Sequence, residues 1–409
     1  MTGMKSQLSF MLSVLLIIAG LSCQDSGKKP EAGIMKARQI AKKIMILDSH
    51  LDVPHRLSKN YEDISLRTAK GHFDYPRAVA GGLNVAFFAV FIPASLQEKG
   101  GAKEKADQQI DLIFDLQNKW PDKFQVITSA AEARKLNSPD KILLGIGIEN
   151  GAALEDDVEN VKYFFDKGVR YITLTHSKNN RICDSSFEEK KNWQGVSPFG
   201  KRVIEKMNDL GIMIDVSHAS DQAFWDIISI SRAPVIASHS GCRTFIPDFE
   251  RNLDDRMIQA IAKNGGVIQI PFGSYFLNKE FNRQGEIVRK QVFEYMTEKK
   301  LSEGDTASEK YYEKLKSEFP AAAGKLTDLI DQIEYVVKLV GIDYVGLGSD
   351  FDGIAALPQG IEDVSSYPHI IQELLTRGYS EKDIRKICGE NFLRVWFEVE
   401  QLSHEPSSL

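Results

Sequence analysis

Histidines and acids recur in this sequence in a pattern suited to binding divalent metal ions. His50 and Asp52 are two residues apart, so on an extended segment both side chains point to the same face and can reach one ion. A single pair of this kind is common in loops and carries little weight alone. However, four of the eight histidines and three acids all follow short apolar runs. These residues are His50, His176, His218 and His239, with Asp52, Glu149 and Asp350.

The same residue types indicate hydrolytic chemistry. Neutral imidazoles and carboxylates are the ligands of zinc and similar ions in hydrolases. Three histidines and two carboxylates exceed one catalytic zinc site, whereas two ions bridged by a carboxylate would use them and would activate a bridging water as the nucleophile. No serine or cysteine motif for covalent catalysis is found. The other histidines fall in predicted loops or helices and are interpreted as structural: His55, His72, His369 and His404.

The apolar runs before these residues predict the elements that position them. Charged stretches with helical spacing lie between most runs, for example residues 158–167, 200–210 and 254–263. This alternation predicts a parallel sheet, and eight repeats in 409 residues favour a closed (β/α)8 TIM-type barrel of the metallo-dependent hydrolase kind over an open sheet. The carboxyl ends of barrel strands meet at one mouth, where distant donors become neighbours. The predicted strands are Ile44–Leu47, Val85–Phe91, Ile142–Ile148, Tyr171–Leu174, Ile212–Val216, Val235–Ala237, Gly266–Ile270 and Tyr344–Leu347.

One segment interrupts this alternation. Residues 278–325 are rich in Lys and Glu and lie between the seventh and eighth runs. We interpret them as a helical insertion in a barrel domain that spans residues 34–402. A charge run of this kind is usually a solvated helical excursion, and a lid or a dimer contact are the alternatives. Residues 403–409 are predicted to be a frayed tail.

The start of the chain resembles an export signal. Lys5 precedes the apolar run 10–19, and small residues follow up to Cys23, which predicts a secretory signal peptide over residues 1–22. The run is too short to span a membrane. Cys23 resembles the lipidated first residue of a bacterial lipoprotein, and residues 23–33 would form a polar tether. We therefore expect an exported lipoprotein anchored in the cell envelope, on the periplasmic or outer surface. An ordinary cleaved signal with an incidental Cys is the alternative.

Composition limits the partners. The net charge is −6 without a basic block, so neither a nucleic acid nor an anionic membrane surface is expected, and small molecules are the predicted substrates. Three further cysteines, Cys183, Cys242 and Cys388, show no spacing typical of a structural zinc cluster. One disulfide among them is possible in an oxidising compartment, but the sequence does not pair it.

Eight stretches of the chain resemble the membrane dipeptidase (renal dipeptidase) family, which are zinc metallopeptidases on a (β/α)8 barrel. Together they cover nearly all of the chain from about residue 40 to residue 398, in the family's order. The stretches are Asp48-Ser49-His50-Leu51-Asp52-Val53-Pro54, Gly147-Ile148-Glu149-Asn150-Gly151, Leu174-Thr175-His176, Asp215-Val216-Ser217-His218, Ala237-Ser238-His239-Ser240, Arg251-Asn252, Gly348-Ser349-Asp350-Phe351-Asp352-Gly353 and Gly389-Glu390-Asn391-Phe392-Leu393-Arg394-Val395.

The resemblance implies a two-zinc dipeptidase, active on L,L-dipeptides and also on dipeptides with a D-residue at the carboxyl end. By this resemblance His50 and Asp52 would hold one Zn²⁺, His218 and His239 the other, and Glu149 would bridge them.

Three further residues would act on the dipeptide. His176 would bind the substrate and stabilise the developing oxyanion. Arg251 would bind the substrate carboxylate, and Asp350 would move a proton from the water to the leaving amine. Members of the family often form dimers.

Two departures from the family concern substrate choice. In the family, an aromatic residue after the seventh strand helps to hold the substrate carboxylate. This chain reads Pro271-Phe272-Gly273-Ser274-Tyr275 there, which does not match the family, so that contact is not carried over. The insertion at 278–325 is also longer than expected.

Two other functions remain open. Another binuclear amidohydrolase, acting on a cyclic amide, a lactone or a deaminated base, would usually carry His-x-His at the first strand and often a carboxylated Lys, whereas this chain has His50-x-Asp52 and Glu149. A lipoprotein that binds peptides without cutting them is the second alternative.

Overall fold

The computed structural model of the protein describes residues 28–301, 306–318, 322–354 and 356–403. The predicted signal peptide, the lipidation residue Cys23 and residues 404–409 lie outside this part. The first helix, α1 (Lys28–Ala41), includes residues 28–33 of the predicted tether. Among the described residues, no helix is both long and apolar enough to cross a membrane.

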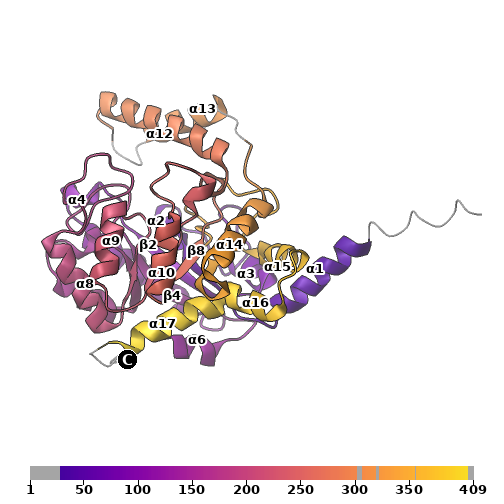
Figure 1. Ribbon diagram of the computed structural model, residues 1–409. Coiled ribbons are helices and arrows are strands. Elements are labelled where there is room, and N and C mark those ends of the chain that lie inside the picture. The colour runs from indigo at the N-terminus through magenta and orange to yellow at the C-terminus, as the bar shows by residue number, and fades with distance from the viewer. Residues whose placement is uncertain (1–27, 302–305, 319–321, 355, 404–409) are drawn as a thin grey trace, which may run out of the picture.

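Eight parallel strands form a nearly closed barrel (Figure 1), which confirms the predicted fold class. The first and last strands meet where the backbone NH of Asp350 donates to the His50 carbonyl, and that of Asp52 to the Phe351 carbonyl. Around the barrel the strands follow chain order: β1 (Ile46–Leu51), β2 (Leu83–Phe91), β4 (Ile142–Glu149), β5 (Val169–Thr173), β6 (Met213–Asp215), β7 (Val235–Ala237), β8 (Val267–Ile270) and β9 (Val345–Leu347).

Two differences from the sequence prediction stand out in the sheet, and the other strand ends lie within two residues of the predicted bounds. A ninth, three-residue strand, β3 (Phe124–Val126), pairs with β4 outside the barrel path and was not predicted. The first strand also continues through Asp48 and Ser49, which were expected to follow it. The barrel accepts these polar residues because both are bonded inside it. Asp48 accepts a hydrogen bond of 2.5 Å from the Tyr367 hydroxyl, and the Ser49 hydroxyl donates to the Ser238 carbonyl over 2.6 Å.

Helices surround the barrel, and capping residues set where they begin. The predicted helix over 200–210 begins at Pro198, because Ser197 caps it by accepting a hydrogen bond from the Gly200 NH. Asp254 caps the next predicted helix in the same way. Besides α1, the helices of the barrel domain are α2 (Val53–Lys59), α3 (Tyr75–Gly81), α4 (Leu96–Lys99), α5 (Ala102–Lys119), α6 (Ala130–Leu136), α7 (Glu159–Asp166), α8 (Pro198–Leu210), α9 (Asp221–Ile230), α10 (Asp255–Lys263), α11 (Ser274–Leu277), α14 (Leu326–Val340), α15 (Tyr367–Thr376), α16 (Glu381–Arg385) and α17 (Asn391–Gln401).

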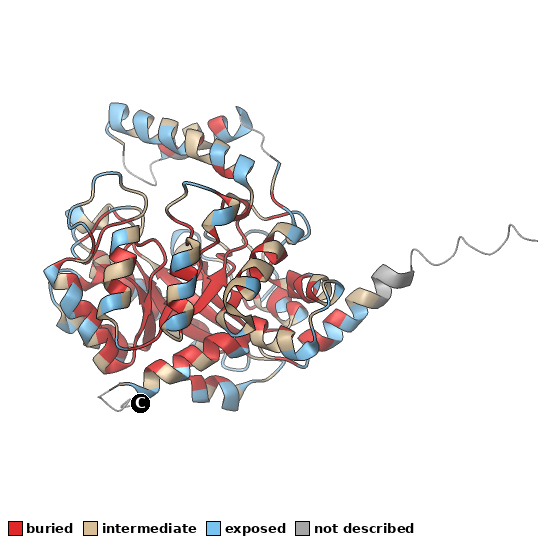
Figure 2. Cartoon of the chain, viewed as in Figure 1, coloured by how far each residue is buried: buried red, intermediate tan, exposed pale blue. Residues whose placement is uncertain are grey.

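The core has two parts, and buried residues fill both (Figure 2). One part lies between the strands and the surrounding helices. The other part fills the barrel. There the centroid of the Phe87 ring of β2 lies 5.1 Å from the ring centroids of both Phe392 and Trp396 of α17, and 5.6 Å from that of Tyr171 of β5. α17 therefore closes one end of the barrel with apolar side chains, and the polar strand ends remain at the other. Within the described residues Cys183, Cys242 and Cys388 are free and buried.

The insertion forms two further helices, α12 (Lys279–Lys299) and α13 (Thr306–Glu318). They lie side by side at the top of Figure 1, while α17 lies at the opposite end of the molecule.

Candidate metal centre and active site

The structure brings the predicted donors together at one end of the barrel. Glu149 is the last residue of β4, and His50 lies within β1. The remaining donors follow their strands within three residues: Asp52 after β1, His176 after β5, His218 after β6, His239 after β7 and Asp350 after β9. Residues far apart in the chain become neighbours because parallel strands all end at the same rim.

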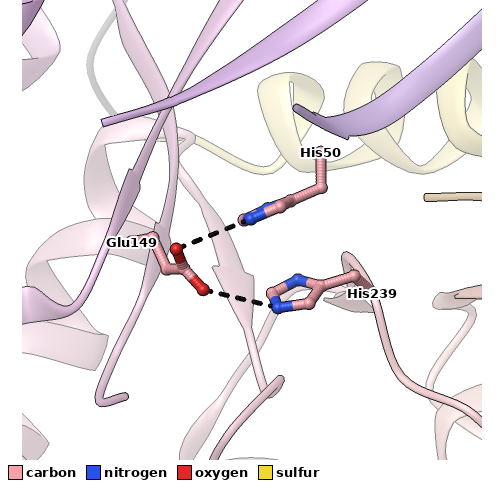
Figure 3. A group of neighbouring side chains, drawn as sticks. All are labelled: His50, Glu149 and His239. Carbon is pink, nitrogen blue, oxygen red and sulfur yellow. Dashed lines mark ion pairs between the residues drawn. The ribbon is translucent and has the colours of Figure 1, made fainter. Parts of the chain in front are cut away.

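Glu149 lies at the centre of this cluster, and its two oxygens face different donors. Figure 3 shows the carboxylate facing both His50 and His239, with one oxygen directed to each ring. Oε2 is 3.6 Å from His50 Nε2. Oε1 is 3.1 Å from His218 Nε2, 3.4 Å from His239 Nε2 and 3.6 Å from His176 Nε2. Glu149 is thus placed to bridge two sets of ligands.

Two acids complete the side of the cluster that contains His50. Asp52 Oδ2 is 3.6 Å from His50 Nε2. Ligand atoms of His50, Asp52 and Asp350 all lie within 4.8 Å of one another. The groups His50–Glu149–His239 and Glu149–His176–His218 satisfy the same criterion.

The donor geometry fits divalent ions. A tetrahedral zinc ion with bonds of roughly 2.0–2.2 Å holds its ligand atoms about 3.4 Å apart, which is close to the separations around Glu149. His50 Nε2 is buried and has no hydrogen-bond partner among the described residues, since the oxygens at 3.6 Å are too distant. Buried polar atoms normally have a partner, so a metal ion would satisfy this nitrogen.

The protonation states of His218, His239 and Glu149 also suit metal binding. Burial lowers the pKa values of His218 and His239 well below the ordinary value, and the nearby Arg251 lowers both further. Both rings are therefore neutral and can offer a lone pair. Burial alone would raise the pKa of Glu149, but the surrounding imidazoles, His50 and His176 foremost, lower it well below the usual range. Glu149 is therefore a carboxylate. His50 differs: burial would lower its pKa, but Tyr171 and Glu149 raise it well above the ordinary value, so an ion would have to displace its proton.

Partners behind the donors orient the imidazole rings. His50 Nδ1 lies 2.9 Å from the Tyr171 hydroxyl, and His239 Nδ1 lies 2.8 Å from Ser238 Oγ. The Ser238 hydroxyl donates in turn to Asp215 over 2.6 Å. Tyr171 can cross to His50 because residue 147 of the neighbouring strand is glycine: a Cβ there would lie 2.0 Å from Tyr171 Cζ.

We expect Tyr171→Phe to weaken metal binding while the fold is kept, because His50 loses its orienting partner. Loss of such a partner typically lowers metal affinity about 10- to 100-fold. Competition with a chelator measures this, and Tyr163→Phe on α7 is a control that leaves the rim unchanged. Equal affinities in Tyr171→Phe and the unmodified protein would show that the hydroxyl does not orient His50.

Backbone conformation contributes to the placement of two donors. His218 has φ 69° and Asp350 has φ 63°, a left-handed region that non-glycine residues rarely adopt. Such strain is typical of functional sites, where the surrounding structure enforces it. Neither value follows from the local sequence.

Arg251 is close to the centre but not on the cavity wall. It is buried, and its Nη1 donates to Ser240 Oγ while Nη2 donates to the His239 carbonyl, both over 2.7 Å. Its guanidinium lies over the Phe276 ring, 5.3 Å from the centroid. In this arrangement Arg251 supports the segment that contains His239. Its Nε has no hydrogen-bond partner among the described residues.

A cavity of about 780 Å³ opens over the donors, within the range of roughly 300–1,000 Å³ common for small-molecule sites. His55 of α2, interpreted above as structural, lies in its wall, where its ring packs edge-on against Phe91. His55 belongs to none of the potential metal-binding groups found. Phe187 and Tyr275 also line the cavity. Apolar and aromatic residues give no sequence signal that separates a cavity wall from a core.

The insertion forms part of the same wall. Contributions from α12 and α13 rule out the interpretation of this segment as a solvated excursion alone, because the following residues line the cavity: Phe281, Gln284, Val288, Arg289, Tyr312 and Lys316.

Fold and site together define a class of protein: a metal-dependent hydrolase-type barrel with its donors at the carboxyl ends of the strands. Residues 34–408 match the model of the membrane dipeptidase family (peptidase family M19), and the chain belongs to this family. The resemblance to this family seen in the sequence is thus confirmed.

Individual relatives agree with this assignment. The chain is similar to dipeptidase 3 of Mus musculus, with 29% identity over 366 residues; the match covers 87% of this chain and 65% of the mouse protein. It is also similar to the probable dipeptidase PvdM from Pseudomonas aeruginosa, with 28% identity, a TM-score of 0.79 and coverage of 91% and 100%. A Rhodobacter sphaeroides metallopeptidase, solved with a phosphinate mimic of L-Ala-D-Ala, shares the fold at 23% identity and a TM-score of 0.72, with coverage of 87% and 99%.

Proposed function

We propose that this protein hydrolyses the peptide bond of dipeptides with two Zn²⁺ per chain. The observation that carries the proposal is the position of Glu149, whose Oε2 faces His50 and whose Oε1 faces His218 and His239. His50 and Asp52 would hold one ion, His218 and His239 the other, and Glu149 would bridge them. Membership of the membrane dipeptidase family supports the choice of substrate.

When bound, the two ions would supply Lewis acidity to the scissile carbonyl and to the water that attacks it. The side chains of this protein would do the rest. His176, on the cavity wall 3.6 Å from Glu149 Oε1, would donate a hydrogen bond to the carbonyl oxygen as negative charge develops there. Arg251 would bind the substrate carboxylate with N–H donors that its bonds to Ser240 and the His239 carbonyl leave unused.

Asp350 would accept the proton of the attacking water and deliver it to the leaving amine. Burial raises the pKa of Asp350 well above its ordinary value, and the neighbouring Asp52 raises it further. Raised pKa values are typical of carboxyl groups that transfer protons in active sites.

Release of free amino acids from a dipeptide panel tests the proposal. The panel should include L,L-dipeptides and L-Ala-D-Ala, because a structural neighbour binds a mimic of the latter and we propose that a D-residue at the carboxyl end is accepted. A cyclic amide and a lactone in the same panel test the amidohydrolase alternative. If zinc is bound and no dipeptide is cleaved, the substrate assignment is wrong. Binding of dipeptides without release would instead favour the peptide-binding alternative.

We also propose export as a lipoprotein, on the pattern of residues 1–23 alone. Cys23→Ser should then move the protein from the membrane fraction to the soluble fraction of the cell envelope, as fractionation and blotting would show. An unchanged membrane fraction would contradict lipidation at Cys23.

A further inference from the structure

The cavity has a wall that is separate from the metal centre. α12 and α13 supply it, and their lining residues face the rim of strand ends. The insertion is packed against the barrel rather than extended from it. Gly285 of α12 lies against the Tyr275 ring so closely that a Cβ at this position would be 2.7 Å from Tyr275 Cε2. Val288 and Leu315 are buried, and Tyr295 stacks on Tyr311 at 4.2 Å between the two helices.

The charge of this wall is positive. Its charged lining residues are Arg289 and Lys316, and Lys59 of α2 adds a third cation to the cavity. Of the acids that line the cavity, Asp52, Glu149 and Asp350 belong to the metal centre. The remaining one, Asp352, is bonded to Arg56 over 2.8 Å and to the His72 NH over 2.5 Å. Away from the metal centre, the described lining residues therefore carry more positive than negative charge.

The two cations of the insertion have acidic neighbours that do not line the cavity. Glu286 accepts from Arg289 Nε and Nη2, and the Arg289 guanidinium lies 5.5 Å from the centroid of the Phe187 ring, itself in the wall. Lys316 Nζ is 3.9 Å from Glu313 Oε1. Glu286 thus bonds one side of the Arg289 guanidinium, and the contact with the Phe187 ring places the guanidinium beside the cavity.

We propose that the α12–α13 wall makes this protein prefer dipeptides that carry an acidic side chain, with Arg289 and Lys316 attracting the additional carboxylate. The inference rests on the proposed dipeptidase function and names its substrate class. Two divalent ions would offset the negative charge of Asp52, Glu149 and Asp350, so the loaded metal centre would not repel a second carboxylate. Arg289 and Lys316 are about half exposed, so their effect should be moderate and should weaken with salt.

The test compares acid and amide dipeptides of equal shape. The ratio of kcat/KM is measured for L-Ala-L-Glu against L-Ala-L-Gln and for L-Glu-L-Ala against L-Gln-L-Ala. We expect the unmodified protein to prefer the acidic member of at least one pair by roughly two- to fivefold at low ionic strength, in line with exposed ion pairs. The double variant Arg289→Gln/Lys316→Gln should lose this preference, and its melting temperature shows whether it is folded.

Lys290→Gln/Lys314→Gln is the matched control, because both lysines are exposed cations of the same helices that do not line the cavity. This variant should keep the acid preference. In the unmodified protein the preference should also fall as salt is added, a measurement that needs no variant. Equal rates for acid and amide dipeptides, or a preference that survives in the folded double variant, would overturn the inference. Cleavage of the amide dipeptides in the same assay would show that the proposed function nevertheless stands.

Discussion

Glu149→Gln should remove bound metal and activity together. Within the part of the chain that the structure describes, this carboxylate is the group whose two oxygens face both sets of donors, so its negative charge would be shared by two ions. The amide keeps the shape but loses this charge and one of the two acceptor oxygens. We expect metal affinity to fall by more than about 100-fold, beyond the effect of losing a partner behind a ligand.

Elemental analysis and turnover of a dipeptide, measured on the same sample, check this result. Glu159→Gln is a suitable control, since Glu159 is an exposed acid at the start of α7. Retention of two metal equivalents in Glu149→Gln would contradict the bridging role.

Asp350→Asn should also lose turnover but, unlike Glu149→Gln, should retain its metal. Asp350 is proposed to move a proton, which the amide cannot do, and loss of a positioned acid or base typically slows a reaction about 10²- to 10⁴-fold. Its φ of 63° is equally accessible to Asn, so the backbone should not change. Metal content and kcat, with Asp343→Asn before β9 as the control, separate binding from turnover.

Asp350 also lies within 4.8 Å of His50 and Asp52 ligand atoms. If Asp350→Asn and Glu149→Gln lost metal to the same extent, Asp350 would be a ligand and the proposed division of roles would be wrong.

The barrel and the meeting of its donors could be predicted from the sequence for one physical reason. Parallel strands leave a periodic pattern of apolar runs, and the fold gathers their carboxyl ends at one rim. Glu149 and His239 could therefore be placed together although 90 residues separate them. The short strand β3 was missed because Gln125 separates its two apolar residues, Phe124 and Val126, so no apolar run marks it. The continuation of β1 through Asp48 was not predicted, because the bond to Tyr367 that stabilises this residue is not visible in hydropathy.

Other features depend on contacts between distant residues. Tyr171 was predicted only as the start of a strand, yet its hydroxyl orients His50. The Lys- and Glu-rich composition of the insertion predicted helices but not which face of the barrel they cover, so the position of Arg289 in the cavity wall could not be foreseen. Arg251, expected at the substrate carboxylate by resemblance, is bonded to Ser240 and the His239 carbonyl.

Anomalous scattering at the zinc edge, from crystals of protein purified without chelators, tests the paired-ion centre most directly. We expect two peaks per chain, roughly 3.5–4 Å apart as in other two-metal sites. One should lie between His50, Asp52 and Glu149 Oε2, and the other between His218, His239 and Glu149 Oε1. A single peak, or none at this rim in protein supplied with zinc, would contradict the two-metal mechanism.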